Sequence, residues 1–450
     1  MPSHSRALDT ADRSMSPIDG YLARFAELDG HEPAWLHRQR KEAIARFASL
    51  GFPTTHLEDW KYTSVTALSA VPFDAAAPDT VTPRERRAAD GLRLGAGIDF
   101  VFVNGFHVPA LSAPAALPAG VTVTSLARAA TEHADLVRAH LGRYADDEQA
   151  FTALNTAFAR DGAFVHLRRG VALPGPLHLV FLSAAAPAPV MTSPRTLIVA
   201  EEDSAATIIE SYAGPGDVTY FTNAVTEIAV GPRAALTHYR LQEEGARAFH
   251  VAAVRARQDA DSRFTSLAVS LGATLSRTDL GTTMDAEGTS CVFDGLYLAG
   301  GDQHVDHHTS IDHRQPHGTS RELYKGILDG RATGVFNGKV YVRPQAQKSD
   351  AQQMNKNLLL SDDAVINTKP QLEIFADDVK CSHGATIGRL SDDALFYLRA
   401  RGIDARTARQ LLIHAFAREL IDRVGIASLR ERLDRALQRR LPHLDEEGAA

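Results

Sequence analysis

The sequence predicts a mainly β protein, in which a parallel β-helix core is flanked by N-terminal and C-terminal α-helical regions. From Ala163 to Ile387, short apolar runs alternate with polar turns, and long helical periodicity is missing. Turn signals in this stretch recur roughly every 25–30 residues, a spacing typical of stacked repeats. Because each repeat would contribute two or three strands and no helix, a solenoid of stacked coils is favoured. A β-sandwich is the alternative architecture for the same pattern.

The chain length indicates several regions. At 450 residues, the chain exceeds the size at which one compact core usually stops growing. We expect a disordered tail over residues 1–18, a helical and mixed region over 19–162, the β-helix core over 163–388 and a C-terminal helical region over 389–450. The helical regions would supply the caps that a solenoid needs at its ends.

Helical signals open the N-terminal region. Tyr21, Phe25 and Leu28 are spaced to share one helix face. A second helix is expected to begin near Pro33, a residue favoured in the first turn, and to end at Gly51.

The segment Glu58–Thr63 carries Trp60 and Tyr62 at positions i and i+2, which fit an extended segment packed on one face. It has no arrangement of groups that would be catalytic, so we interpret it as a docking strap. The other elements expected before the core are strands at Asp99–Val103 and Val121–Val123, and helices near residues 132–142 and 147–160.

Composition and charge exclude several classes of function. The net charge is −7, so no basic field draws the chain to nucleic acid or to an anionic membrane. Two cysteines cannot build a disulfide framework or supply four thiolates to a cluster, and they suggest a reducing compartment. No apolar run reaches the roughly 18–20 residues of a membrane span, and the N-terminus does not resemble a secretory signal. A cytoplasmic protein is therefore expected.

The candidate metal ligands are Cys381 and His383, where the β-rich stretch gives way to helical sequence. Side chains at i and i+2 of an extended segment share a face, so both would point the same way. A thiolate beside an imidazole suits iron, zinc or an iron–sulfur species. Two ligands cannot close a four-coordinate site, so a metal here would need further ligands. The alternative is a cysteine that packs as a small hydrophobic residue beside an unrelated histidine.

The histidine-rich stretch His304–His317 is a second candidate. In a strand, His304, Asp306 and His308 would share one face, and His307 would lie on the other. The functional interpretation is a metal site or a proton relay. The structural alternative is a ladder of hydrogen-bonded polar residues on one face of the solenoid.

The tail from about residue 391 to residue 441 is expected to be helical. Ser391 and Gly402 fit the N-cap and C′ positions of a first helix. A longer helix over about 404–424 is apolar on more than one face, so it is either deeply buried or contacts both its own body and a partner. A last helix carries Leu429, Leu433 and Leu437.

Several motifs are distributed over nearly the whole ordered chain. They are Gly51-Phe52-Pro53, Glu58-Asp59-Trp60-Lys61-Tyr62-Thr63, Tyr324-Lys325-Gly326-Ile327, Gly338-Lys339-Val340, Asn367–Ile374, Ala376–Thr386 and Phe396–Ile403. Together they resemble the SufB/SufD family of the Suf iron–sulfur cluster assembly machinery. The residues before Ala385-Thr386 are Cys-Ser-His-Gly, whereas the SufB branch carries Glu-His-Glu there and has more cysteines. The chain therefore resembles the SufD branch, with the SufB branch as the alternative.

The resemblance implies a right-handed parallel β-helix with helical ends. In this family, SufD pairs with its paralogue SufB, and each binds a SufC ATPase through its C-terminal helices. The nascent cluster is expected at the SufB–SufD interface, where the interface histidine of the family corresponds to His383 and Cys381 stands beside it. The tail helices correspond to the ATPase-docking region.

We therefore expect a non-catalytic assembly subunit that holds no metal tightly by itself. Iron or a cluster would occupy the interchain site transiently, and a homodimer would form in the absence of SufB. The alternative from another class is a β-helix enzyme, a carbohydrate lyase or a metal hydrolase, with its metal at His304, His307 and His308.

Overall fold

The computed structural model describes residues 16–28, 32–78, 81–95, 97–113 and 117–440. Residues 1–15 of the expected tail lie outside the described residues. From Ser16 the expectation of disorder is wrong, because a helix begins at Pro17. The Ser16 hydroxyl accepts a hydrogen bond from the backbone N–H of Asp19, whose carboxylate accepts one from the Ser16 N–H. This capping box satisfies N–H groups that the first helical turn leaves unpaired.

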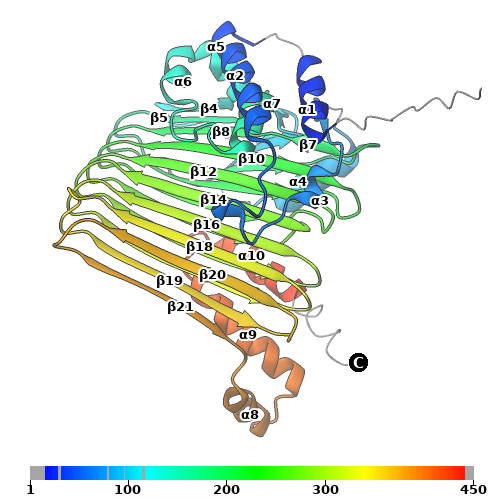
Figure 1. The fold of residues 1–450 in the computed structure, drawn as a ribbon, viewed down its shortest axis with the longest axis vertical. Helices are drawn as coiled ribbons and strands as arrows, with labels where there is room; N and C mark the ends of the chain where they lie inside the picture. Colours follow the sequence, from blue (N-terminus) through cyan, green and yellow to red (C-terminus); the bar gives the residue numbers. More distant parts are fainter. Residues whose placement is uncertain (1–15, 29–31, 79–80, 96, 114–116, 441–450) are drawn as a thin grey trace, which may run out of the picture.

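Two β-sheets form the body of the molecule (Figure 1). The strands of the first part are β1 (Asp74–Ala75), β2 (Ile98–Val103), β3 (Phe106–His107), β4 (Val121–Ser125), β5 (Ala163–Leu167), β6 (Leu177–Leu182), β7 (Val190–Thr192), β8 (Arg195–Ala200), β9 (Ala205–Ala213), β10 (Tyr220–Val230) and β11 (Ala235–Gln242). They are followed by β12 (Phe249–Gln258), β13 (Arg263–Ser270), β14 (Leu275–Met284), β15 (Ser290–Ala299), β16 (His304–His313), β17 (Thr319–Leu328), β18 (Thr333–Val342), β19 (Asp350–Leu359), β20 (Val365–Ile374) and β21 (Lys380–Gly388).

From β8 to β21, successive strands alternate between the two sheets. Sheet A has the order β20-β18-β16-β14-β12-β10-β8-β5-β4, and sheet B has the order β21-β19-β17-β15-β13-β11-β9-β6-β2-β3. Apart from the pairs β4–β5 and β2–β3, neighbours on these two paths run parallel. The predicted parallel solenoid is therefore confirmed, and the β-sandwich, whose sheets are antiparallel, is excluded.

The strand register gives the length of each coil. His304 on β16 lies opposite Leu275 on β14 and Thr333 on β18, so each step is 29 residues (304 − 275 and 333 − 304). This agrees with the predicted spacing. The step from Thr333 to Val365 on β20 is 32 residues (365 − 333), because the turns of the last coil are longer.

The main core lies between the two sheets, where inward side chains stack from coil to coil. The rings of Tyr324 and Phe336 lie 5.0 Å apart between centroids. Gly295 leaves room for this stack, since a Cβ at that position would lie 2.1 Å from Cε1 of Tyr324. The residue pattern of the strands is thus set by which side chains fit between two closely spaced coils.

Helices cover the first coils (Figure 1). They are α1 (Pro17–Ala26), α2 (Ala34–Leu50), the 3-10 helix η1 (Glu58–Trp60), α3 (Thr66–Ser69), α4 (Pro83–Leu92), α5 (Leu126–Glu132), α6 (Ala134–His140) and α7 (Ala150–Phe158). The first two helices, the strand at 98–103 and the strand at 121–125 agree with expectation. The helix expected near 132–142 corresponds to α6, whereas α5 was not expected; the two helices are separated at His133, whose φ is −127°.

Three helices follow the last strand: α8 (Asp392–Ala400), α9 (Ala405–Ile421) and α10 (Ala427–Arg440). Helices α9 and α10 pack on the outer face of sheet B through residues such as Ile413, Leu420 and Leu433. Helix α8 lies beyond β21 at the end of the solenoid (Figure 1). Residues 441–450 of the expected helical region lie outside the described residues. None of the described helices is both long and apolar enough to cross a membrane.

Candidate functional site

Cys381 and His383 lie on β21, the last strand of sheet B. Cys381 is opposite Ala351 on β19, and His383 is opposite Gln353. Because Cys381 packs against the core between the sheets, its face of β21 is the inward one. His383 comes two residues later and is on the same face. The shared face that the spacing predicts is therefore present.

This end of the solenoid is open. Within the described chain, β21 pairs only with β19 and β20 pairs only with β18, so one edge of each strand has no strand partner. His383 is exposed and Cys381 is partly exposed. Exposed apolar side chains accompany the two edges, namely Ile387 on β21 and Ile374 and Phe375 at the end of β20. An unpaired and partly apolar strand edge is a surface that another chain can extend.

The cysteine and the histidine supply part of a coordination shell. Burial raises the pKa of the Cys381 thiol, a backbone hydrogen bond at Ala351 opposes this shift, and the Asp350 carboxylate adds to it. The thiol is therefore neutral at neutral pH and must release its proton to bind a metal. In the part of the chain that the structure describes, no group of three or more His, Cys, Asp or Glu side chains is arranged to hold a metal ion. The pair offers two of the four donors of a tetrahedral site.

A row of inward polar side chains leads from His383 into the solenoid. Gln353 lies opposite Glu322 on β17, and its Nε2 donates a hydrogen bond to Glu322 Oε2 at 2.7 Å. A Cβ at Gly338 would lie 2.2 Å from Gln353 Nε2, so this glycine makes the space that the amide occupies. Burial raises the pKa of the Glu322 carboxyl from 4.5 to about 7. Near neutral pH, the interior beneath His383 therefore contains a carboxyl group that is partly protonated.

The second cysteine lies in the same column as the first but several coils away. Cys291 on β15 is followed by Ser320, Ala351 and Cys381 on the next three strands of sheet B. Three strand spacings place the two cysteines about 14 Å apart. Cys291 is buried, and burial raises the pKa of its thiol well above the ordinary value. It is too far from Cys381 to bind the same metal ion.

The histidine-rich stretch forms β16, and the predicted alternation of its faces is confirmed. His307 is buried between the sheets, where its ring centroid lies 5.2 Å from that of Tyr297. His304 and His308 are on the opposite, outward face. The predicted metal site of His304, His307 and His308 is therefore wrong, because the sheet separates the His307 side chain from those of His304 and His308. Burial lowers the pKa of His307 to about 3, so this ring is neutral.

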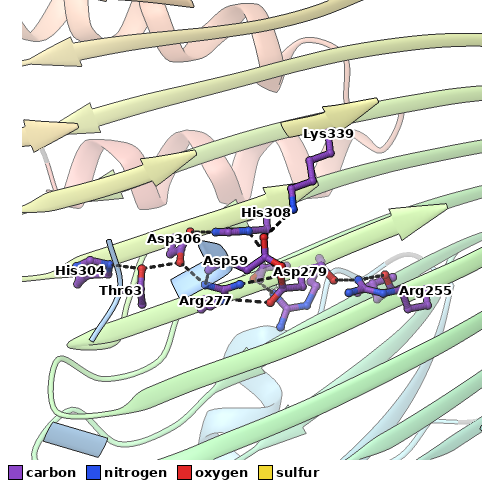
Figure 2. A network of polar contacts seen from close by, with 12 residues as sticks. Asp59, Thr63, Arg255, Arg277, Asp279, His304, Asp306, His308 and Lys339 are labelled. Atoms are coloured by element: carbon purple, nitrogen blue, oxygen red, sulfur yellow. Dashed lines mark hydrogen bonds and ion pairs between the residues drawn. The ribbon is translucent and has the colours of Figure 1, made fainter. Parts of the chain in front are cut away.

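The outward face of β16 anchors the segment Leu57–Thr63, which we call the strap (Figure 2). Thr63 Oγ1 donates a hydrogen bond to Asp306 Oδ2 at 2.6 Å and lies 2.9 Å from His304 Nε2. Arg277 Nη1 donates to the same Asp306 oxygen at 2.9 Å. The Arg277 guanidinium also lies 3.7 Å from the centroid of the Trp60 ring. These contacts assign the outward side chains of β16 a structural role.

Asp306 is ionised in this network. Burial alone would raise the pKa of its carboxyl, but His308 and Arg277 hold that pKa far below its ordinary value. His308 Nε2 lies 3.1 Å from Asp306 Oδ1. The carboxylate therefore compensates the buried guanidinium, as a buried charge requires.

The strap is not extended as predicted. Residues 58–60 form a 3-10 turn, because the N–H of Trp60 donates to the Leu57 carbonyl and the N–H of Thr63 donates to that of Trp60. This turn separates the two aromatic rings. Trp60 packs against the first coils, whereas 41% of Tyr62 is exposed.

The strap crosses four neighbouring strands of sheet A. Besides Arg277 on β14 and Asp306 on β16, it reaches β18 and β20. Lys339 Nζ donates to Asp59 Oδ1 at 2.6 Å, and Lys369 on β20 pairs with Glu58. The interpretation as a docking strap therefore agrees with the structure, although the shape of the segment does not.

The C-terminal helices have one face on the solenoid and one face free. Lys325 Nζ on β17 donates to the Phe416 carbonyl of α9 at 2.7 Å. On the other side, 75% of Phe396, 57% of Tyr397 and 47% of Leu411 are exposed. Helix α9 thus contacts its own body and also presents apolar side chains outward, so it is not deeply buried on all sides.

Comparison with known proteins adds two family matches and several relatives. The family described as SUF system FeS cluster assembly, SufBD core domain, matches residues 181–416, and the SufBD protein N-terminal region matches residues 14–179. The chain is 40% identical to an iron–sulfur cluster assembly SufBD family protein of Synechocystis, over 92% of each chain. It is 32% identical to the iron–sulfur cluster assembly protein SufD of Escherichia coli, over 90% of this chain and 93% of that protein. It is 26% identical to SufD of Bacillus subtilis, over 96% of this chain and 100% of that protein.

Proposed function

Because this chain belongs to the SufBD family and is an iron–sulfur cluster assembly protein of the SufD type, we propose that it forms one half of a two-solenoid assembly scaffold. Its proposed partners are a SufB paralogue and a SufC ATPase. It performs no catalysis itself and works in the cytoplasm. Iron and the nascent cluster are cargo that occupies the interchain site transiently, and the isolated chain holds neither tightly.

The open end of the solenoid supports the proposed pairing with SufB. The edges of β20 and β21 have backbone groups that a second parallel solenoid can pair with, and their apolar side chains would be covered by the contact. The same edges would join two copies of this chain when SufB is absent, since a self-complementary edge permits a symmetric dimer.

The observation that carries the proposal is the position of His383. It is exposed beside Cys381 on the inward face of the last strand, where a chain that extends the solenoid would come directly against it. The imidazole nitrogen and, after deprotonation, the thiolate are donors that suit iron. The partner would provide the remaining donors, because the described residues of this chain bring no third ligand to the pair.

Helices α8 and α9 support the proposed ATPase docking. They carry the exposed apolar side chains Phe396, Tyr397 and Leu411, and α8 lies beyond β21 at the open end (Figure 1). Helix α9 is also tied to sheet B by Lys325, which contacts the Phe416 carbonyl and Glu419. A nucleotide-dependent movement of the ATPase would therefore act on the sheet that carries His383, provided that the ATPase contacts differ between its two states.

The test is the variant His383→Ala in the full complex. We expect it to fold and to co-purify with the SufB paralogue and the ATPase, because the His383 side chain is exposed. Maturation of a recipient apo-protein should be lost, since one donor of the interchain site is missing. The matched control is His56→Ala, which replaces another exposed histidine that lies on neither β20 nor β21.

Maturation at the wild-type rate by His383→Ala would refute the ligand role of this histidine. Failure of the purified chain to bind either partner, with His383 intact, would refute the scaffold proposal itself. Loss of maturation in the His56→Ala control would show that the effect is not specific to the open end.

A further inference from the structure

A groove of about 1070 Å³ lies on the outer face of sheet A. Strands β12, β14, β16 and β18 form its floor. One wall is the chain from Leu50 to Trp60, and the other is the chain from Arg143 to Thr152. Neither Cys381 nor His383 lines the groove. Its volume is sufficient for a small-molecule ligand.

The floor is hollow because of two small residues. Arg255, Gly281, Ser310 and Lys339 lie opposite one another on four successive strands. Gly281 and Ser310 occupy the middle of this row, and their small size creates a depression in the floor. The Arg255 side chain lies over Gly281, since a Cβ there would be 3.2 Å from Arg255 Cδ. A guanidinium group therefore lines the depression at its β12 side.

Arg255 has no carboxylate bound to it among the described residues. Its Nη1 donates to the backbone carbonyls of Asp279 at 2.6 Å and Val254 at 3.2 Å (Figure 2), while Nε and Nη2 have no hydrogen-bond acceptor in the described part of the chain. Burial lowers the pKa of this guanidinium below its ordinary value, although the charges of Asp279 and Asp146 oppose the shift. The cation is thus partly desolvated, and among the described residues it is compensated by backbone dipoles and by carboxylates at a distance.

Other cations of the floor differ from Arg255 in this respect. Each forms an ion pair with a carboxylate: Arg257 with Asp285, Arg277 with Asp279 and Asp306, Arg314 with Asp285 and Asp312, Arg343 with Asp312, and Lys339 with Asp59. Arg143, Asp146 and Glu148 are on the exposed wall, where solvent and salt screen their charges. An anion that enters the groove therefore finds, among the described residues, one partly buried cation without a bound carboxylate.

We propose that this groove binds a small ligand through an oxyanion group, either a phosphate or a carboxylate, which is held by the Arg255 guanidinium. The planar guanidinium presents parallel N–H groups that match two oxygens of such an anion. The hydroxyl groups of Thr283 and Ser310, which also line the groove, are donors for the remaining oxygens. The body of the ligand lies between the two walls, where Trp60 and Tyr144 provide aromatic surface.

The experiment measures the binding of inorganic phosphate and of citrate to the full-length chain by isothermal titration calorimetry, at constant ionic strength. We expect saturable binding of at least one probe at a single site. Arg255→Gln should weaken this binding about ten-fold or more, because a charge-assisted contact is lost. Ser310→Ala should weaken it by a smaller factor. Arg233→Gln is the matched control, since this exposed arginine pairs with Asp203 in a turn outside the groove.

The outcomes separate the two sources of the anion. Binding of phosphate alone assigns a phosphorylated ligand, and binding of citrate alone assigns a carboxylate. If neither probe binds the wild-type chain saturably, or if Arg255→Gln and Arg233→Gln bind as the wild type does, the proposal is overturned. Should Arg255→Gln fail to fold, unchanged binding by Ser310→Ala overturns it equally, because that hydroxyl lies on the same row of the floor.

Discussion

Replacing Glu322 with glutamine should remove a pH dependence from the stability of the solenoid. The carboxyl group is enclosed between the sheets, where Oε2 accepts a hydrogen bond from Gln353. Burial raises the pKa of Glu322 to about 7, and the Asp294 carboxylate adds to the shift. Glutamine has nearly the same shape, and its carbonyl accepts the same hydrogen bond without a charge.

The sign and the magnitude follow from proton linkage. A group whose pKa is raised by folding binds more protons in the folded state than in the unfolded state, so its stabilisation is complete below the unfolded pKa and is lost as pH rises through the folded pKa. With an unfolded pKa of 4.5 and a folded pKa of about 7, Glu322 contributes about 1.4 kcal/mol at pH 6 and close to zero at pH 8. Between these two pH values, the free energy of unfolding of the wild type should therefore fall by about 1.3 kcal/mol more than that of Glu322→Gln.

The assay is urea unfolding of both proteins at pH 6 and pH 8, followed by far-ultraviolet circular dichroism. The difference between the two proteins at each pH is compared, so that all other titrating groups, including the histidines, cancel. Infrared difference spectra of the folded wild type and variant detect the carboxylic acid directly. The protonated band should be present at pH 6 and nearly absent at pH 8.

Equal loss of stability by both proteins between pH 6 and pH 8 would contradict the argument. If, in addition, no protonated band is found at pH 6, Glu322 is ionised in the folded protein. In that case, the polar residues beneath His383 stabilise the Glu322 carboxylate more strongly than the hydrogen bond from Gln353 alone would.

Two further predictions concern the strap and the C-terminal helices. Thr63→Val removes a hydrogen bond to the Asp306 carboxylate and should lower the protection of the strap against amide hydrogen exchange by about 1.5–3 kcal/mol. If the amides of residues 57–63 exchange at the same rate in Thr63→Val as in the control Thr55→Val, Thr63 does not hold the strap. The double variant Phe396→Ser and Leu411→Ser should fold normally but lose co-purification with the ATPase, because it removes apolar side chains that are 75% and 47% exposed. The control is Leu57→Ser, at an exposed leucine outside these helices, and retained binding by the double variant would place the ATPase elsewhere.

The solenoid could be predicted because stacked coils produce a repeating pattern of strands and turns in the sequence. Coils of similar length bring turns to regular positions, and Asp203, Arg233 and Asp261, which lie in three successive turns between strands, each have a positive φ. The alternation of side chains along a strand likewise predicted that Cys381 and His383 share a face of β21. Both inferences depend only on local geometry, which the order of residues specifies directly.

The strap and the buried carboxyl could not be predicted in the same way. Trp60 and Tyr62 have the spacing of an extended segment, but Arg277, far along the chain, is the residue that selects Trp60 as the ring to be buried. Glu322 lies in a strand whose local sequence has no sign of its burial. Its environment is created by Gln353 on the next coil of its own sheet, a long-range contact that only the register reveals.

Both helical regions hold the last coils, and this arrangement connects the fold to the proposed function. Four lysines near the open end pair with carboxylates of flanking segments: Lys339 and Lys369 of sheet A with Asp59 and Glu58 of the strap, and Lys325 and Lys356 of sheet B with Glu419 of α9. Partly exposed ion pairs of this kind are each worth only about 0–1 kcal/mol, so they position the sheets more than they stabilise them. Because the strap holds sheet A while α9 holds sheet B, an ATPase that displaces α9 would shift β21 relative to β20. His383 lies on β21, so the geometry of the interchain site would change with the state of the ATPase.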